Sequence, residues 1–246
     1  MHRLAATAVA LALAGCDLAL PGEGDRPETA REFPRAQRDV SELSGNQFST
    51  ETERDSLGEA TKVMDLAEIR PGMTVADIGA GEGYYTVRLA ERVGREGRVL
   101  AQDIDREALS RLGQRVERER LENVSIRLGT PDDPKLPASS FDRVFLVHMY
   151  HEVQEPYAFL WRLWPALKPD GRVIVVDMNR PTDQHGIDPL LLSCEMERVG
   201  FTLETFKDAP ELVGYYAQFK RAAKRPEPAD IKPCRREPGT SGGPAH

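Results

Sequence analysis

The sequence has few of the residues that mark several large classes of protein. Its 246 residues include three cysteines, Cys16, Cys194 and Cys234, which are too few and too scattered to predict a disulfide framework or a zinc site. Basic residues do not dominate, because the formal net charge is -7, and no basic patch is interleaved with aromatic residues. Binding to nucleic acid is therefore not expected.

Long apolar runs are also missing. The alanine-rich run over residues 4–14 is too short to cross a bilayer, which takes about 20 residues. It has the length of a signal-peptide core and ends in Leu13-Ala14-Gly15-Cys16, which resembles the lipobox of bacterial lipoproteins. The resemblance implies a signal peptide over residues 1–16 and a mature chain lipidated at Cys16, anchored to the periplasmic side of the cell envelope. A chance apolar start to a cytoplasmic protein is the alternative.

Composition divides the remaining chain into three parts. Residues 17–40 are rich in Pro, Gly, Glu and Arg, which predicts a flexible tether. Residues 41–220 show the periodic apolar pattern of a folded domain. Residues 221–246 return to Pro, Gly and charged residues, which predicts a disordered tail.

Within the domain, strand-like and helix-like runs alternate. Strands are expected at 74–78, 98–102, 124–128, 142–147 and 172–177, with helices at 84–93, 106–120 and 156–167 between them. A last helix at 188–199 precedes two strand-like runs at 201–206 and 215–219. The alternation predicts an α/β fold with a doubly wound, mostly parallel seven-stranded sheet that ends in an antiparallel hairpin.

A glycine-rich loop follows the first of these strands. It reads D-x-G-x-G-x-G, with Asp77, Gly79, Gly81 and Gly83 at every second position. Glycines let the backbone approach a ligand closely, and the next helix offers free N–H groups. The loop does not match the dinucleotide-binding pattern G-x-G-x-x-G, because Tyr84 occupies the position of its third glycine. It does not match a P-loop either, because the ending G-K-[ST] is absent. An acidic residue before the loop repels a pyrophosphate and suits a cationic ligand.

This loop resembles that of class I S-adenosylmethionine-dependent methyltransferases. Three further features resemble the family in the same order: Asp103 at the end of the second strand, Ser-Phe-Asp at 140–142 and Leu-Lys-Pro-Asp-Gly at 167–171. The resemblance implies a Rossmann-like methyltransferase fold, and S-adenosylmethionine as cofactor with a small-molecule methyl acceptor.

The resemblance also assigns cofactor contacts. Asp77 and the three glycines would lie beside the methionine part, and Asp103 would accept hydrogen bonds from the ribose hydroxyls. Asp105 is the alternative to Asp103, although it suits the cap of the helix that starts near residue 106. Asp132 is the first candidate for the adenine contact, and Thr130 and Asp133 are the alternatives.

Candidate catalytic residues follow the fourth strand, in the run HMYHE. Histidine is the side chain best suited to acid–base chemistry near neutral pH, so His148 and His151 are candidate general bases, with packing under the next helix as the alternative for each. Two histidines without a third spaced ligand do not predict a metal site. Before the domain core, Glu51, Arg54 and Asp55 are expected to form a solvated charged face on a helical run, although in this fold such a segment often covers the cofactor.

Three functions remain in competition. The first is methyl transfer to a small molecule. The second is a non-catalytic, cofactor-binding envelope lipoprotein that retains the fold, because an exported domain would not obviously meet a cofactor made in the cytoplasm. The third, an NAD-dependent oxidoreductase, is disfavoured by Tyr84.

Overall fold

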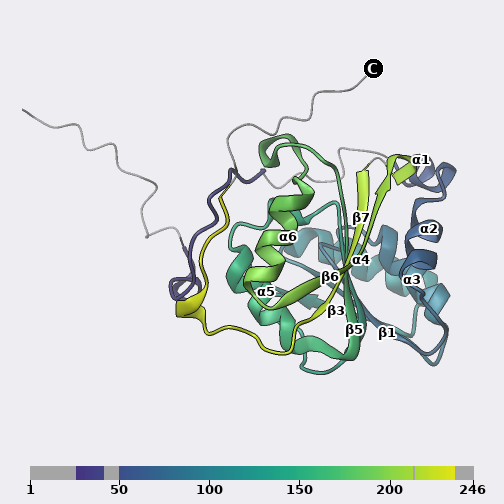
Figure 1. Cartoon of the computed structure of the whole chain (residues 1–246). Coiled ribbons are helices and arrows are strands. Elements are labelled where there is room, and N and C mark those ends of the chain that lie inside the picture. The colour runs from purple at the N-terminus through teal and green to yellow at the C-terminus, as the bar shows by residue number, and fades with distance from the viewer. Residues whose placement is uncertain (1–25, 42–49, 213, 236–246) are drawn as a thin grey trace, which may run out of the picture.

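The structure, a computed structural model, describes residues 26–41, 50–212 and 214–235. Its centre is a seven-stranded sheet in the order β3-β2-β1-β4-β5-β7-β6 (Figure 1). The first five strands pair in parallel, and β7 pairs antiparallel with both β5 and β6. The strands are β1 (Thr74–Ile78), β2 (Arg98–Asp103), β3 (Val124–Leu128), β4 (Phe141–Val147), β5 (Leu167–Asp177), β6 (Phe201–Ala209) and β7 (Gly214–Arg221). The predicted doubly wound fold with an antiparallel C-terminal hairpin is confirmed.

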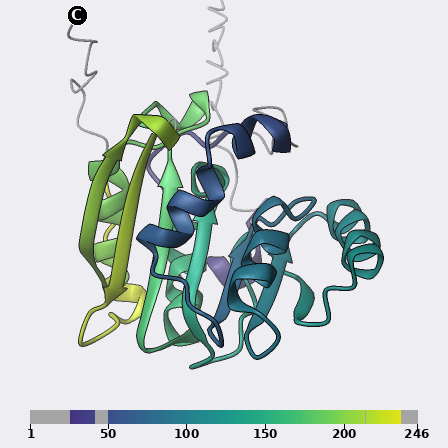
Figure 2. The ribbon, with the colours of Figure 1, turned by 90° about the vertical axis from the view of Figure 1, so that its right-hand side faces the viewer.

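Helices cover both faces of the sheet. They are α1 (Glu51–Ser56), α2 (Glu59–Leu66), α3 (Tyr84–Val93), α4 (Arg106–Glu119), α5 (Pro156–Leu163) and α6 (Pro189–Arg198). Short 3₁₀ turns lie at Glu28–Ala30, Tyr150–Glu152, Trp164–Ala166, Thr182–Gln184, Pro210–Leu212 and Pro228–Asp230. One core packs α5 and α6 against the sheet, and a second packs α2 and α3 against the opposite face. Figure 2 shows α2, in blue, in front of the strands and α1, in dark blue, above them.

The central strands are apolar on both sides because both faces are covered. Residues 173–176 of β5 are fully buried, and they read Val-Ile-Val-Val without alternation. Side chains from this strand enter the two cores alternately, since neighbouring residues in a strand point to opposite faces. This packing fixes the carboxyl ends of β1, β4 and β5, which carry most of the candidate site.

The described parts of the predicted tether and tail are packed against the domain. The last part of the segment 222–235 runs beside residues 26–41, and a bridge between Gln37 and Arg235 joins the two (Figure 1). Arg26 forms a buried ion pair with Glu155, with Nη2 and Oε2 2.6 Å apart. Arg38 forms another with Glu195. The expectation of flexibility over these residues was wrong, because charged residues that look solvated in the sequence pair with buried carboxylates.

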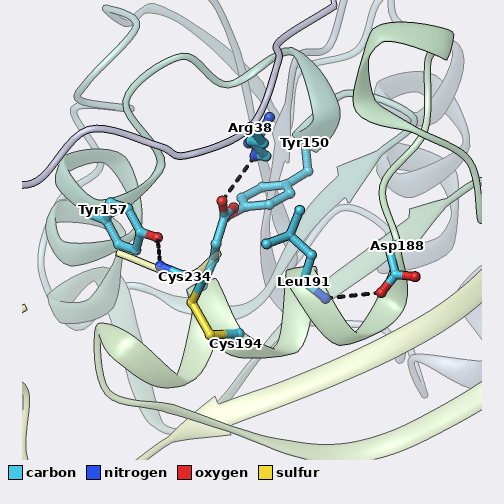
Figure 3. The surroundings of a disulfide bond; sticks show 8 residues. Arg38, Tyr150, Tyr157, Asp188, Leu191, Cys194 and Cys234 are labelled. Atoms are coloured by element: carbon cyan, nitrogen blue, oxygen red, sulfur yellow. Dashed lines mark hydrogen bonds and ion pairs between the residues drawn. A yellow bond between two sulfur atoms is a disulfide. The ribbon is translucent and has the colours of Figure 1, made fainter. Parts of the chain in front are cut away.

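A disulfide fastens the C-terminal segment. Cys194 on α6 is bonded to Cys234, and the hydroxyl of Tyr157 accepts a hydrogen bond of 2.6 Å from the Cys234 backbone N–H (Figure 3). The cysteine count is too small for a framework, but two of the three residues form this single bond. Cys16 lies outside the described residues. Among the residues described, no helix is long and apolar enough to cross a membrane.

Candidate active site

The glycine loop joins β1 to α3, and all three of its predicted glycines have positive φ angles. The values are 67° at Gly79, 54° at Gly81 and 92° at Gly83, a region that side chains disfavour. Two positions are also sterically closed. A Cβ on Gly83 would lie 2.4 Å from Cδ1 of Leu112, and one on Gly79 would lie 3.0 Å from Cβ and Cγ of Met149. Met149 follows β4, so the HMYHE segment packs directly against the loop.

Asp77 lies at the end of β1 and is 3% exposed. Its Oδ2 accepts a hydrogen bond of 2.6 Å from the hydroxyl of Thr86 on α3. Burial raises the pKa of Asp77 to about 6, although the Thr86 hydrogen bond and the charge of Arg54 oppose the rise. The hydrogen bond and the nearby charge do not offset the loss of hydration of this carboxyl. A buried ionisable group with such a shifted pKa is typical of a ligand-binding position.

Asp103 ends β2 and ties that strand to the glycine loop. One carboxylate oxygen accepts from the backbone N–H of Gly81 at 2.8 Å, and the other accepts from the N–H of Asp105 at 2.9 Å. Asp105 accepts from the N–H of Glu107 and caps α4, as predicted. Asp77 and Asp103 therefore approach the same loop from the ends of two adjacent strands.

Asp132 is buried, but its carboxylate is held by other side chains. It accepts from Nη1 of Arg162 at 2.7 Å, from the hydroxyl of Thr29 at 2.6 Å and from that of Thr130 at 2.9 Å. Burial raises its pKa, but these three partners outweigh burial and lower it. Asp132 and Arg162 line a surface hollow with Thr29, Thr130 and Asp133. Thr29 belongs to the N-terminal segment, which sequence analysis did not place here.

Arg54 lies in the interior of the site, contrary to the expected solvated face. Its guanidinium stands 3.8 Å from the centre of the Tyr84 ring and pairs with Glu59 on α2 at 2.6 Å. The Tyr85 hydroxyl donates to the same Glu59 carboxylate at 2.9 Å. The side chain of Arg54 is 18% exposed. The helical run before the core therefore covers the start of α3.

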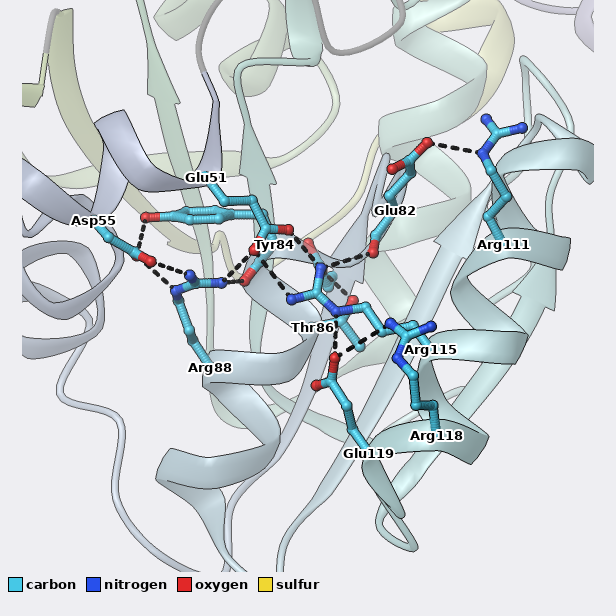
Figure 4. A network of polar contacts seen from close by, with 11 residues as sticks. Glu51, Asp55, Glu82, Tyr84, Thr86, Arg88, Arg111, Arg115, Arg118 and Glu119 are labelled. Carbon is cyan, nitrogen blue, oxygen red and sulfur yellow. Dashed lines mark hydrogen bonds and ion pairs between the residues drawn. The ribbon is translucent and has the colours of Figure 1, made fainter.

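Ion pairs hold α1 in this position (Figure 4). Glu51 contacts Arg115 of α4 at 2.5 Å, and Asp55 contacts Arg88 of α3 at 2.5 Å. The Tyr84 hydroxyl also donates to Asp55, at 3.1 Å. Glu51 and Asp55 are 41% and 50% exposed, so each pair adds little stability, roughly 0–1 kcal/mol. The Arg54–Glu59 pair, with both side chains largely buried, is the better shielded contact between α1 and the rest of the domain.

The two candidate histidines have different partners. Nε2 of His148 lies 3.6 Å from the carboxylate of Glu59, beneath α2. Burial alone would raise the pKa of Glu59, but His148 and Arg54 outweigh it and lower the pKa to about 2. His148 has a φ of 53°, which is uncommon for a residue other than glycine. Its backbone N–H donates to the carbonyl of Val176 at 2.8 Å, which anchors this turn.

His151 is 2% exposed and pairs with Asp177 at the end of β5. Its Nδ1 lies 2.9 and 3.0 Å from the two carboxylate oxygens, one of which also accepts from the Met178 N–H. Nδ1 therefore donates its proton to Asp177, which leaves Nε2 of the neutral ring with a lone pair. Nε2 has no hydrogen-bond partner within the described part of the chain.

A third histidine comes close to His151 through the fold. His185 lies in the loop after β5, with its ring centre 5.7 Å from that of His151. A carboxylate oxygen of Glu152 lies 3.8 Å from Nε2 of His151. Sequence analysis expected no metal site because the HMYHE run lacked a third spaced ligand, and the fold brings one in from a separate loop.

A family model for the methyltransferase domain matches residues 69–220. The chain belongs to this family. Nocamycin O-methyltransferase of Saccharothrix syringae is 35% identical over 114 residues, which cover 46% of this chain and 41% of that protein. The ubiquinone/menaquinone biosynthesis C-methyltransferase UbiE of Idiomarina loihiensis is 31% identical over 120 residues, covering 48% and 47%. The chain spans about half the length of the curated relatives it matches.

Solved structures support the fold. A SAM-dependent methyltransferase from Aquifex aeolicus has a TM-score of 0.59 at 23% identity, covering 70% of this chain and 97% of its own. The [4+2]-cyclase SpnF has a TM-score of 0.60 at 15% identity, with 80% and 91% covered. The roles of individual residues in binding a cofactor stay predictions.

Proposed function

We propose that this methyltransferase-family protein uses S-adenosylmethionine to methylate a small molecule. The observation that carries the proposal is the pair Asp77 and Asp103, which approach the glycine loop from adjacent strand ends. Asp77 is buried with a raised pKa and has spare acceptor capacity for an ammonium group. Each carboxylate oxygen of Asp103 accepts one hydrogen bond from a backbone N–H. Each oxygen therefore keeps a lone pair that can accept a hydrogen bond from a ribose hydroxyl.

These residues fit the cofactor that the family implies. Two carboxylates suit a ligand with a cationic amino-acid part and a diol, and positive φ angles keep the loop free of side chains. Asp77 and the glycines Gly79, Gly81 and Gly83 would hold the methionine part, and Asp103 the ribose. Asp132 is a weaker candidate for the adenine contact, because Arg162 already neutralises its carboxylate. When bound, the cofactor supplies an electrophilic methyl group.

For the acceptor, His151 is the better of the two candidate bases. Asp177 orients its ring and would stabilise the imidazolium that forms when Nε2 takes a proton. His148 lies against Glu59 and suits the closure of the site beneath α2. Relatives named as a nocamycin O-methyltransferase and a ubiquinone/menaquinone biosynthesis C-methyltransferase support a small organic acceptor that takes the methyl group on oxygen or carbon. No nucleic-acid partner is proposed.

We also propose that the protein is exported and lipid-anchored at Cys16, on the periplasmic side of the envelope. The disulfide between Cys194 and Cys234 supports this location, because disulfides persist in oxidising compartments and are rare in the cytoplasm. The same observation favours a second candidate function, a cofactor-binding lipoprotein that does not catalyse, since the cofactor is made in the cytoplasm. A cytoplasmic protein would need neither the lipobox nor the disulfide.

The decisive experiment is titration calorimetry with S-adenosylhomocysteine and, separately, with NAD. We expect the former to bind and the latter not to. Gly81→Val should abolish binding, and Gly72→Val is the matched control, since Gly72 has a φ of 85° but open space around its missing Cβ. Equal affinity in the folded Gly81→Val protein would refute the site. Binding without turnover on a panel of phenolic and quinol acceptors would favour the non-catalytic alternative.

A further inference from the structure

Three side chains that commonly bind metal ions converge at the carboxyl end of the sheet. His151 and Glu152 lie in the 3₁₀ turn after β4, and His185 lies in the loop after β5. One potential ligand atom from each falls within 4.8 Å of the others. The two imidazole rings meet edge to face at 85°. None of the three belongs to the glycine loop or to the carboxylates that flank it.

The environment of His151 points to a ligand at this position. Its Nδ1 proton goes to Asp177, a carboxylate that is itself fully buried, so the lone pair of Nε2 is directed toward the cluster. Metal-binding histidines commonly donate their second ring nitrogen to a carboxylate in this way, which fixes the tautomer and makes the ligand more basic. Nε2 lies in a side chain that is 98% buried and has no hydrogen-bond partner among the residues described. A buried polar atom without a partner is costly unless something binds it.

The loop that carries His185 is fixed in place. His185 has a φ of 56°, and its backbone N–H donates to the hydroxyl of Ser41 in the N-terminal segment. The Ser41 hydroxyl in turn donates to the carbonyl of Thr182. Ile187 is fully buried, and its N–H donates to Met178 at the end of β5. The third ligand is therefore positioned by tertiary contacts on both sides.

We propose that His151, Glu152 and His185 form a binding site for a divalent transition-metal ion. Two imidazoles with one carboxylate suit Zn²⁺, Fe²⁺, Co²⁺ or Ni²⁺, whereas Mg²⁺ and Ca²⁺ prefer an all-oxygen set. Three protein ligands leave at least one coordination position for water or another molecule. Asp177 is the positioning residue, acting on the metal through His151.

The separations match a site that closes slightly on binding. Tetrahedral ligands at about 2.0–2.1 Å from a metal lie about 3.3–3.4 Å apart. His151 Nε2 and Glu152 are already 3.8 Å apart, and the widest separation in the cluster is within 4.8 Å. Glu152 and His185 are only half-buried, so their side chains have room to move inward.

The metal site goes beyond the proposed methyl transfer and does not depend on it. A metal on Nε2 of His151 would occupy the lone pair that a general base needs, so a loaded metal site replaces the base role of His151 but leaves the proposed cofactor binding and methyl transfer in place. Metal binding and S-adenosylhomocysteine binding are measured separately, and either proposal can fail while the other stands.

The test uses the full-length, tag-free protein, stripped with a chelator and titrated at pH 7.5 with Zn²⁺, and with Co²⁺ as a spectroscopic probe. We expect one equivalent of Zn²⁺ to bind with a micromolar or lower Kd, Mg²⁺ not to bind detectably, and Co²⁺ to give visible ligand-field bands. Glu152→Gln and His185→Gln should each weaken Zn²⁺ at least 100-fold. Asp177→Asn should weaken it by about 10- to 100-fold, the usual effect of removing such a partner.

His148→Gln is the matched control, because His148 lies in the same HMYHE run but pairs with Glu59 outside the cluster. It should bind Zn²⁺ like the wild type. The proposal is overturned if the wild type binds neither Zn²⁺ nor Co²⁺ below 100 µM, or if folded Glu152→Gln and His185→Gln proteins bind as well as the control. Should either variant fail to fold, X-ray absorption at the zinc edge of the wild type decides, because two imidazoles must contribute to the metal's outer-shell scattering.

Discussion

Replacing Asp77 with asparagine should change how the free energy of unfolding depends on pH. The side chain is 3% exposed, and burial raises its pKa from an ordinary 3.8 to about 6. Because the pKa is higher in the folded state, that state holds the proton more tightly than the unfolded chain does. The stabilising contribution of the protonated group is complete below pH ~4 and is lost as the pH rises through about 6.

The magnitude follows from the shift. Roughly two pKa units correspond to about 3 kcal/mol. Asparagine cannot ionise, but its carbonyl oxygen can still accept the hydrogen bond from the Thr86 hydroxyl. Part of this is already lost at pH 4, where the unfolded chain has begun to ionise, so between pH 4 and pH 8 the wild type should lose about 2.4 kcal/mol that Asp77→Asn keeps. All other titrating groups are common to both proteins and cancel in the comparison.

Urea unfolding of both proteins at pH 4, 5, 6, 7 and 8 measures this difference. Thr86→Val is a useful companion, because removing the hydrogen bond that lowers the pKa of Asp77 should enlarge the loss. If the free energy of unfolding changes with pH in the same way in wild type and Asp77→Asn, the raised pKa of the buried Asp77 carboxyl is refuted. At pH 8, S-adenosylhomocysteine should stabilise the wild type and not the variant, since the charge that destabilises the free protein is the one that would attract the ligand's ammonium group.

Three further predictions concern other parts of the chain. Asp103→Ala should weaken S-adenosylhomocysteine by about 1–3 kcal/mol in calorimetry, because ribose hydroxyls lose a charged acceptor; normal binding together with loss in Asp105→Ala would identify Asp105 as the ribose ligand instead. Reducing the Cys194–Cys234 bond, which closes a loop of 40 residues, should lower the free energy of unfolding by about 4 kcal/mol, and an unchanged urea midpoint would count against it. Wild-type protein should pellet with membranes and Cys16→Ser should not, whereas soluble wild type that retains Met1 or His2 at its N-terminus would contradict export.

The regular elements could be predicted because local pattern and tertiary environment agree in them. Strands β1 and β3 and helix α3 have the predicted bounds, since a glycine directly follows the last residue of each, at positions 79, 129 and 94. The glycine loop was also recognisable, because φ above zero at three alternate positions leaves few residues but glycine. The resemblance also singled out Asp103 at the end of the second strand, and the structure places its carboxylate on the backbone N–H of Gly81.

The remaining parts depend on contacts between distant residues. Arg26 and Arg38 belong to a polar stretch without periodicity, and only the buried carboxylates of Glu155 and Glu195 order it. Likewise, the sequence offered His148 and His151 as equivalent candidate bases, whereas the backbone turn at His148 sends the two rings to different partners. Spacing in the sequence indicates which residues are close along the chain, whereas the order of strands in the sheet determines which loops lie next to one another.

The packed N-terminal segment also alters the geometry of the proposed anchor. A tether over residues 17–40 would let the domain range widely, but Arg26 is fixed to Glu155 at the start of α5. Ten peptide units then separate Cys16 from the fold, and fully extended they span at most about 35 Å. A lipid at Cys16 would therefore hold the start of α5 within about 35 Å of the membrane surface.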